Sequence, residues 1–273
     1  MKRNRGLIAN KGHPEHLKFN AVVLAGERKK KNDLLEGFQV PVKALIPVKG
    51  RPMAERVIQA LVDSQCIEKI FLCGPDRALF EGLVPLSKFF HMGRIVWVQN
   101  ENSPSASALK AMRQAGDDKP VLVTTADHAL LKPNMIQYFC RNAGRTGLDL
   151  VVGLARLEIV QKCCPGIKRT SYKFRDGSYC SCNLFGFMNR QAFKAAEFWQ
   201  KAEEKRKHPL KIVATFGWYW VVRYLLGAVD LSQAFDRVSK VIGCTAGPLI
   251  LPFPQAAIDV DTLQDWKMAE RII

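Results

Sequence analysis

The stretch NAVVLAGERKKKNDLLEGFQVPVKALIPVKGRPM, residues 20–53, decides how the fold is interpreted. Its apolar run 21–24 is rich in β-branched residues, which is typical of a strand buried on both faces of a parallel sheet. The strand is expected to end at Ala25 and Gly26, where small residues let a ligand approach the backbone at the carboxyl edge of the sheet. Four cations follow within five positions, so a polyphosphate is the expected partner of this loop: Arg28, Lys29, Lys30 and Lys31.

A second part of the stretch is built around Lys43. The apolar segment 44–48 follows this lysine and leads through Gly50 and Pro52 into an amphipathic helix. This arrangement predicts that Lys43 lies beside the end of the first strand. The alternative is that these residues bind no ligand and form only a buried strand, a turn and a solvated basic loop.

Taken together, LAG, the basic loop and PVKALIPVKGRPM resemble the nucleotide-binding signature of the sugar-phosphate nucleotidyltransferases and the molybdenum-cofactor guanylyltransferase-like NTP transferases. In that superfamily the glycine loop wraps the nucleotide, and a loop cation and the following lysine hold its phosphates. The resemblance assigns catalytic phosphate contacts to Arg28 and Lys43. It assigns nucleotide binding to Leu24, Ala25, Gly26 and Glu27, with Glu27 standing where many members carry a second glycine.

Composition sets outer bounds on the protein class. The chain has 273 residues, 48% of them hydrophobic and 24% charged, which predicts a folded protein with one large domain or two small ones rather than disorder. Its 41 Lys and Arg against 25 Asp and Glu give a net charge of +16. Nucleic acid, an anionic membrane surface, phosphorylated substrates and a merely solvated basic surface all fit that balance.

The eight cysteines favour a reduced, cytoplasmic setting, since no secretory signal is expected in the basic N-terminal residues. A peripheral position at the membrane stays open. The Cys163–Cys164 and Cys180–Cys182 pairs allow a zinc hypothesis, although structural zinc sites usually space paired ligands by two or more residues.

Short apolar runs alternate with helical segments from residue 20 onward. The runs at 21–24, 69–74, 94–98, 120–125 and 148–154 predict a doubly wound, mostly parallel, Rossmann-like α/β sheet. We expect a basic extension at 1–19 and one domain at 20–273. The resemblance implies a GT-A-like nucleotidyltransferase fold with a nucleotide-binding part at about 20–155, an acceptor part at about 156–255 and a closing metal motif at 256–266.

Residues 99–109 connect the third and fourth predicted strands. Small hydroxyl residues followed by Pro104 predict the start of a helix whose backbone N–H groups are free for a ligand. By resemblance, Gln99, Ser103 and Ser107 would help to hold the base. An ordinary capped helix explains the same pattern.

Three aspartates are candidates for a divalent cation. Asp127 directly follows the fourth strand, at the sheet edge where a cation bridging phosphates would lie. Alternation in the segment 256–266, AAIDVDTLQDW, predicts that Asp259 and Asp261 share one face of a strand that turns into a helix capped by Thr262. The resemblance implies a Mg²⁺ site made of Asp127 and Asp261 first and Asp259 second, whereas helix capping is the alternative for each. His128 is expected to be a neighbour of this site and not a ligand.

The middle of the chain is expected to cover the acceptor. A hairpin is predicted at 172–179 around an Asp-Gly turn, followed by a strand at 182–187. A helix is predicted at 190–207, and segment 212–229 is expected to be a buried helix, with a membrane-interface patch as the alternative. Candidates for binding a phosphorylated acceptor are Lys168, Arg169, Lys173 and Asn183.

These expectations define a Mg²⁺-dependent nucleotidyltransferase that moves a nucleoside monophosphate from an NTP to a phosphorylated small molecule, with release of pyrophosphate. Such a reaction needs alignment and charge neutralisation more than an acid or base. Two other classes stay open: a GT-A-like glycosyltransferase that uses a nucleotide-sugar, and a non-catalytic basic protein that binds nucleic acid or membrane. The paired carboxylates disfavour nucleic acid, because a phosphate-binding surface gains nothing from aspartates.

Overall fold

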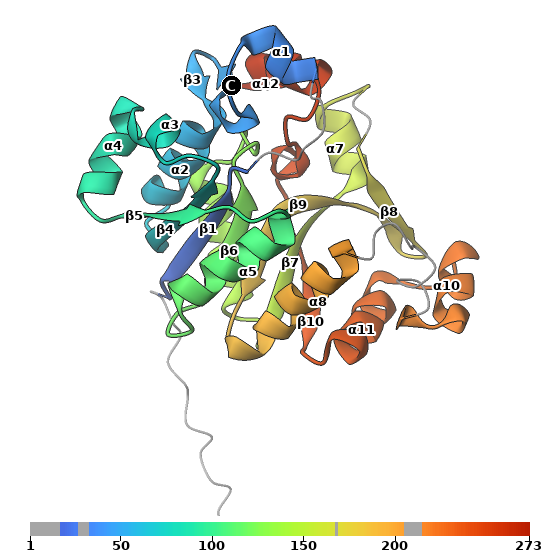
Figure 1. Cartoon of the computed structure of the whole chain (residues 1–273). Coiled ribbons are helices and arrows are strands. Elements are labelled where there is room, and N and C mark those ends of the chain that lie inside the picture. The colour runs from blue at the N-terminus through green and yellow to red at the C-terminus, as the bar shows by residue number, and fades with distance from the viewer. Residues whose placement is uncertain (1–16, 27–32, 167–168, 205–214) are drawn as a thin grey trace, which may run out of the picture.

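A mixed eight-stranded sheet runs through the part of the chain that the computed structural model describes, residues 17–26, 33–166, 169–204 and 215–273 (Figure 1). The predicted contacts of Glu27, Arg28 and Lys168 lie outside the described residues. The strands follow the order β10-β7-β9-β6-β1-β4-β5, and β8 pairs with β9. Their bounds are β1 Phe19–Leu24, β4 Ile67–Gly74, β5 Ile95–Gln99, β6 Val121–Thr125, β7 Leu150–Arg156, β8 Ser171–Phe174, β9 Gly177–Phe187 and β10 Ala246–Ile250.

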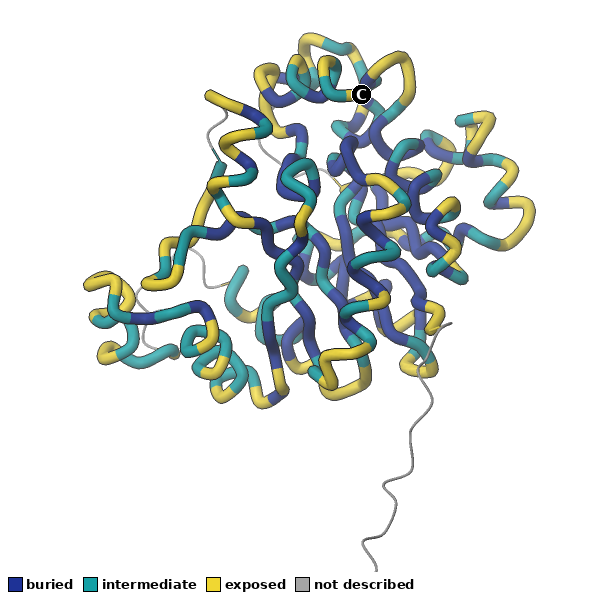
Figure 2. Tube along the Cα trace, turned by 180° about the vertical axis from the view of Figure 1, so that it is seen from behind, coloured by how far each residue is buried: buried dark blue, intermediate teal, exposed yellow. Residues whose placement is uncertain are grey.

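The parallel half of the sheet confirms the five strands predicted from the apolar runs. β1 lies between β4 and β6 and pairs with both in parallel, while β5 extends the sheet beyond β4. Ala21, Val22 and Val23 are fully buried, as the central strand of a doubly covered sheet requires. Figure 2 shows these central strands in the colour of buried residues. The central position of β1 explains why its carboxyl end, at residues 24–26, reaches the middle of one sheet edge.

Helices cover both faces of the sheet. One face packs against α2 (Met53–Asp63), α4 (Val84–His91) and α6 (Pro133–Ala143), and the other against α5 (Pro104–Ala115), α8 (Phe193–Glu204) and α11 (Leu231–Ile242) (Figure 1). The remaining described elements are α1 Asp33–Phe38, α3 Ala78–Glu81, α7 Leu157–Cys163, α10 Trp218–Leu225, α12 Leu263–Ile272, η1 Lys43–Leu45, η2 Arg190–Ala192, η3 Pro254–Ala257, β2 Pro47–Val48 and β3 Arg51–Pro52. Two helical layers around one sheet confirm the doubly wound α/β prediction.

The predicted hairpin is present, but its second strand continues into the centre of the sheet. β8 and β9 pair around the Asp176-Gly177 turn, and β9 then runs antiparallel between β6 and β7. The separate strand expected at 182–187 is therefore the second half of β9. Asn183, within β9, has a left-handed backbone with φ of 47°, close to an irregularity in the β7–β9 pairing. This conformation distinguishes Asn183 from its neighbours in the strand.

The expectation of a buried helix within 212–229 is wrong. Of that segment the structure describes residues 215–229, where α10 forms a helix of eight residues with none buried. Apolar composition cannot distinguish a helix inside a core from one that lies on a surface. No helix within the described ranges combines the length and apolar character needed to cross a bilayer.

The closing segment differs in detail from the predicted strand. η3 ends at Ala257, residues 258–262 are extended without strand pairing, and α12 follows. The predicted cap of α12 is confirmed, because Thr262 and Asp265 form a reciprocal capping box. The backbone N–H of Val260 donates to the carbonyl of Asp127 at 3.0 Å, so this segment lies directly against the loop that follows β6.

Candidate active site

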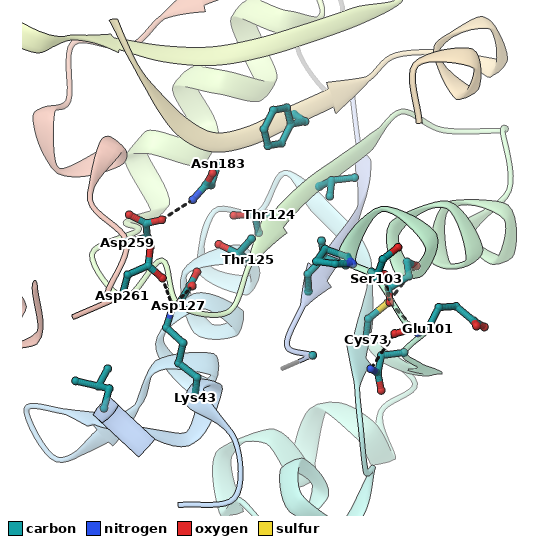
Figure 3. A pocket seen from close by; sticks show the side chains of 18 of the residues that line it. Lys43, Cys73, Glu101, Ser103, Thr124, Thr125, Asp127, Asn183, Asp259 and Asp261 are labelled. Atoms are coloured by element: carbon teal, nitrogen blue, oxygen red, sulfur yellow. Dashed lines mark hydrogen bonds and ion pairs between the residues drawn. The ribbon is translucent and has the colours of Figure 1, made fainter. Parts of the chain in front are cut away.

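A cavity of about 980 Å³ opens at the carboxyl ends of β1, β4 and β6. It extends from the carboxyl end of β1 to the closing segment, with α5 and α8 contributing to its wall (Figure 3). Of the residues predicted to act in a site, nine line this cavity: Leu24, Gly26, Lys43, Ser103, Ser107, Asp127, Asn183, Asp259 and Asp261.

Asp127, Asp259 and Asp261 form a carboxylate cluster at one end of the cavity (Figure 3). One carboxylate oxygen from each residue lies within 4.8 Å of those of the other two. Asp127 comes from the end of β6, whereas the other two come from the closing segment, more than 130 positions later in the chain. The topology thus brings together the three aspartates that the sequence singled out.

Lys43 neutralises part of this cluster. Its Nζ lies 2.6 Å from Oδ2 of Asp127 and also donates to Oδ1 of Asp261. η1 fixes the backbone of Lys43, and Val42 and Ala44 on either side are buried. Burial alone would lower the pKa of Lys43, but the two carboxylates outweigh it and hold the pKa above its ordinary value. Lys43 is therefore fully protonated at neutral pH.

Asp127 is the most enclosed member of the cluster. Burial would raise its pKa, but the ammonium of Lys43 outweighs burial and lowers it, so the carboxylate is ionised. Its second oxygen, Oδ1, is buried and accepts no well-formed hydrogen bond. A buried carboxylate oxygen without a partner is costly unless another group binds it. Together with two neighbouring carboxylates it fits Mg²⁺, which prefers oxygen ligands.

Hydrogen bonds from Arg169 and Asn183 fix the position of Asp259. Arg169 donates to Oδ1 of Asp259 and to its carbonyl oxygen, and Nδ2 of Asn183 donates to Oδ2 at 3.1 Å. Burial and the adjacent carboxylates of Asp127 and Asp261 raise the pKa of Asp259 to about 6. Asp259 therefore takes up a proton more readily than Asp127, whose pKa is lowered.

The opposite end of the cavity is formed by the first strand and the start of α5. Ser103 caps α5 by accepting from the N–H of Ala106 at 3.2 Å, and the Ser107 hydroxyl accepts from the N–H of Glu101 at 2.8 Å. These contacts confirm the predicted capped helix. A Cβ on Gly26 would approach Nδ2 of Asn100 to 3.3 Å, so the loop after β1 passes close to the residues after β5.

Several predicted site residues do not line the cavity. Ala25 is buried beside it, and Gln99 is exposed, with its amide donating to the carbonyl of Pro75 at 2.8 Å. Lys173 is exposed on β8, and the guanidinium of Arg169 is occupied by Asp259 and Asp265. The cavity lining includes none of these four.

The structure also adds lining residues that the sequence did not suggest. Asn100 and Glu101 follow β5 directly, so the rule that sites lie after parallel strands could have found them. Phe185 from β9 and Trp199 from α8 form a stacked pair with ring centroids 6.5 Å apart. No sequence signal joins these two aromatic residues, because they belong to different elements that meet only in the folded sheet.

Two further sequence hypotheses concern residues next to the cluster. His128 is buried, and burial lowers the pKa of its ring to about 4. It does not belong to the group of potential metal ligands, in line with the expectation that it is a neighbour. The four cysteines of the zinc hypothesis form no comparable group, because in the described parts of the chain the carboxylate cluster is the one set of three or more His, Cys, Asp or Glu side chains close enough to share an ion. The thiols of Cys163 and Cys164 contact each other at 3.4 Å without such a group around them.

A doubly wound sheet with a carboxylate cluster and a lysine at its carboxyl edge is the arrangement expected above for a nucleotidyltransferase or a GT-A-like glycosyltransferase. Comparison with family models gives the family: residues 21–215 match the MobA-like NTP transferase domain, and the chain belongs to that family.

Individual relatives agree with this assignment. A hypothetical transferase from Thermus thermophilus is 26% identical in sequence, with a TM-score of 0.77 over 92% of this chain and 100% of that one. The 4-diphosphocytidyl-2C-methyl-D-erythritol synthase of Anaerococcus prevotii is 14% identical, with a TM-score of 0.57 over 94% and 96%. A CMP:2-keto-3-deoxy-manno-octonic acid synthetase solved with CTP is 9% identical, also with a TM-score of 0.57, over 93% and 98%. These last two likenesses concern the fold.

A curated relative matches a part of the chain. The bifunctional protein GlmU of Bdellovibrio bacteriovorus is 31% identical over 116 residues, which cover 42% of this chain. The match spans 24% of that relative, about a quarter of its length.

Proposed function

We propose that the protein transfers a nucleoside monophosphate from an NTP to a phosphorylated small molecule and releases pyrophosphate, with Mg²⁺ as cofactor. The observation that carries the proposal is the contact of Lys43 with Asp127 and Asp261 inside the cavity. This contact places a cation that can bind phosphate oxygens beside carboxylates that can bind a metal ion, and binding of a triphosphate needs both.

In the proposed reaction an oxygen of the acceptor phosphate attacks the α-phosphorus of the NTP. A new oxygen–phosphorus bond forms, the bond between the α-phosphorus and the bridging oxygen breaks, and pyrophosphate leaves with that electron pair. The nucleophile is already ionised, so no side chain has to remove a proton. Lys43, and Arg28 by its position in the sequence, would offset the negative charge on the phosphates.

The carboxylate cluster would hold Mg²⁺ through Asp127 and Asp261, with Asp259 as a third ligand. When bound, the ion would neutralise negative charge on the phosphates. Asp127 supports this role because it offers a buried oxygen without a well-formed hydrogen bond. Asp259 supports it because Arg169 and Asn183 fix the direction of its carboxylate.

The two ends of the cavity separate the proposed substrates. The nucleotide would lie over Leu24 and Gly26 and along the start of α5, where Ser103 and Ser107 order the backbone. The acceptor would lie near Asn183 and the Phe185–Trp199 pair. Lys168 and Lys173 stay candidates for its phosphate, and Arg169 would act on the acceptor through Asp259.

Calorimetric binding of CTP, GTP, UTP and ATP, each with and without Mg²⁺, tests the proposal without knowledge of the acceptor. We expect Mg²⁺-dependent binding of one nucleotide, weakened at least about tenfold in Asp127→Asn, since this change removes a charged ligand but keeps the shape of the side chain. Asp118→Asn is the matched control, because Asp118 is exposed and does not line the cavity. Equal affinity in wild type and Asp127→Asn would remove Asp127 from the metal site, and no binding of any NTP would refute the transferase proposal.

A further inference from the structure

Cys66 and Cys140 form a pair of thiols at the edge of the sheet opposite the cavity. Cys66 directly precedes β4, which pairs in parallel with β1, so it lies at the amino end of strands whose carboxyl ends reach the cavity. Cys140 lies near the end of α6 and is 2% exposed. Neither residue lines the cavity, and the proposed nucleotidyl transfer uses neither of them.

Contacts between α6 and the turn before β4 hold the two thiols together. Gln137, one turn before Cys140 on the same face of α6, donates through Nε2 to the carbonyl of Ser64 at 3.1 Å. Cys66 packs against the core cluster that contains Cys140, and its own carbonyl accepts the N–H of Phe19 at 2.9 Å. A hydrogen bond joins the two thiols. The pair is therefore a fixed feature of the packing between a helix and the start of a strand.

The two thiols have different environments. Cys66 is partly exposed, whereas Cys140 is buried. The Cys140 thiol, together with the cations Lys18 and Arg141, outweighs burial and lowers the pKa of Cys66 to about 7. The contact with Cys66 and burial raise the pKa of Cys140 well above its ordinary value. At pH 7 about half of Cys66 is thiolate, while Cys140 keeps its proton. A partly exposed thiolate beside a second thiol is typical of cysteines that oxidants modify reversibly.

We propose that Cys66 is a modification site for hydroperoxides and that Cys140 converts the product into an intramolecular disulfide. The Cys66 thiolate attacks a peroxide oxygen, a sulfur–oxygen bond forms, and the oxygen–oxygen bond breaks with its electron pair on the leaving hydroxide or alkoxide. The sulfur of Cys140 then attacks the sulfenic sulfur. The sulfur–oxygen bond breaks, and the hydroxyl leaves as water with the proton of Cys140. One peroxide is reduced for each pair of thiols that is oxidised.

The surroundings of the other cysteines explain why the reaction is assigned to this pair. In five of them burial raises the pKa of the thiol: Cys73, Cys164, Cys180, Cys182 and Cys244. Cys163 is partly exposed and contacts the thiol of the buried Cys164 at 3.4 Å. It therefore offers a matched control for a partly exposed cysteine that lies beside a buried one.

Treatment of the reduced, folded full chain with hydrogen peroxide at pH 7 tests the proposal. Remaining thiols are blocked with N-ethylmaleimide before the protein is denatured, and they are then counted by mass spectrometry. We expect wild type to lose two of its eight thiols, peptide mapping to link Cys66 to Cys140, and dithiothreitol to restore both thiols. Cys66→Ser should lower the initial rate of thiol loss at least about tenfold, because an ordinary thiol with a pKa of about 8.5 is only roughly 3% ionised at pH 7.

Two further variants separate the roles of the pair. Cys140→Ala removes the resolving thiol, so dimedone should label a sulfenic acid at Cys66 during peroxide treatment. Cys163→Ser should react as wild type does. Since the pair lies outside the cavity, Cys66→Ser should keep Mg²⁺-dependent NTP binding, and its partly exposed position should keep the fold.

Three results would overturn the proposal. The first is wild-type protein that keeps all eight thiols while a cysteine-containing peptide in the same solution is oxidised. The second is an equal rate of thiol loss in wild type and Cys66→Ser. The third is a disulfide that joins Cys66 to a cysteine other than Cys140. None of these results depends on whether the protein binds an NTP.

Discussion

Arg169 is a positioning residue for the carboxylate cluster, and its substitution gives the most direct test of the site as a built structure. Its side chain is 9% exposed and bridges Asp259 to Asp265, whose side chains are 24% and 8% exposed. Asp265 in turn forms the capping box that starts α12. Arg169 therefore links the segment that carries Asp259 and Asp261 to the helix that follows it.

Replacing Arg169 by Met leaves two mostly buried carboxylates without their cation. Breaking a buried ion pair from one side typically costs about 3–5 kcal/mol. Asp265 keeps its bonds from the Thr262 N–H at 2.9 Å and hydroxyl at 2.7 Å, which places the expected cost at the lower end, about 3 kcal/mol. For a chain of this length that corresponds to a loss of roughly 6–12 °C in unfolding temperature.

Urea unfolding at neutral pH and calorimetric NTP binding measure the two consequences of Arg169→Met. We expect the free energy of unfolding to fall by about 3 kcal/mol, and Mg²⁺-dependent NTP binding to weaken because Asp259 is no longer oriented. Lys173→Met is the control, since Lys173 is exposed and its loss should change stability by less than about 0.5 kcal/mol. An unchanged unfolding free energy combined with a raised KM for the acceptor would refute this reasoning and show that Arg169 binds the acceptor directly.

Two further predictions concern neighbours of the cluster. Burial lowers the pKa of His128 from 6.5 to about 4, so the unfolded chain takes up a proton at this residue at a higher pH than the folded protein does. The contribution of the neutral His128 ring to folding stability is therefore complete above pH 6.5 and is lost as the pH falls toward 4. Between pH 7 and pH 4.5 the free energy of unfolding should therefore fall by about 2.5 kcal/mol more in wild type than in His128→Asn. Equal decreases in the two proteins would contradict a buried, neutral His128 ring. Lys43→Met should tighten Mn²⁺ binding to the nucleotide-free protein, measured by electron paramagnetic resonance, and weaken Mg²⁺-dependent NTP binding, since Lys43 contacts the same carboxylates that a metal would use. A Lys43→Met variant that weakens both would mean that Lys43 organises the cluster instead of competing with the ion.

The parallel half of the fold could be predicted because its signals are local. Short β-branched runs at even intervals identify buried parallel strands, and a carboxylate directly after such a strand identifies the site edge. For this reason Asp127 could be predicted without contact information, whereas Asp259 and Asp261 were predicted from alternation in the segment 256–266 and from the resemblance of that segment to the NTP transferases. The strand expected at Asp259 is absent, but the segment still brings Asp259 and Asp261 to Asp127, because the N–H of Val260 donates a hydrogen bond to the carbonyl of Asp127.

The half of the sheet formed by β9, β7 and β10 depends on contacts that the sequence does not contain. β10 (Ala246–Ile250) includes Gly247 and Pro248, which argue against a strand, but an edge position tolerates a residue without an N–H donor. No local sequence pattern predicts that β9 lies between β6 and β7 either. It is this insertion that places Asn183 beside Asp259 and Phe185 in the cavity.

Two cationic side chains reduce the charge repulsion within the carboxylate cluster. Lys43 pairs with Asp127 and Asp261 from the cavity side, and Arg169 pairs with Asp259 from the protein side. The pKa of Asp259 is nevertheless raised to about 6, first by burial and then by the adjacent carboxylates of Asp127 and Asp261. A divalent cation would supply the missing charge, whereas a further lysine would have to be buried at additional cost. We therefore expect the affinity of the cluster for a divalent cation to come from the negative charge that Lys43 and Arg169 leave uncompensated.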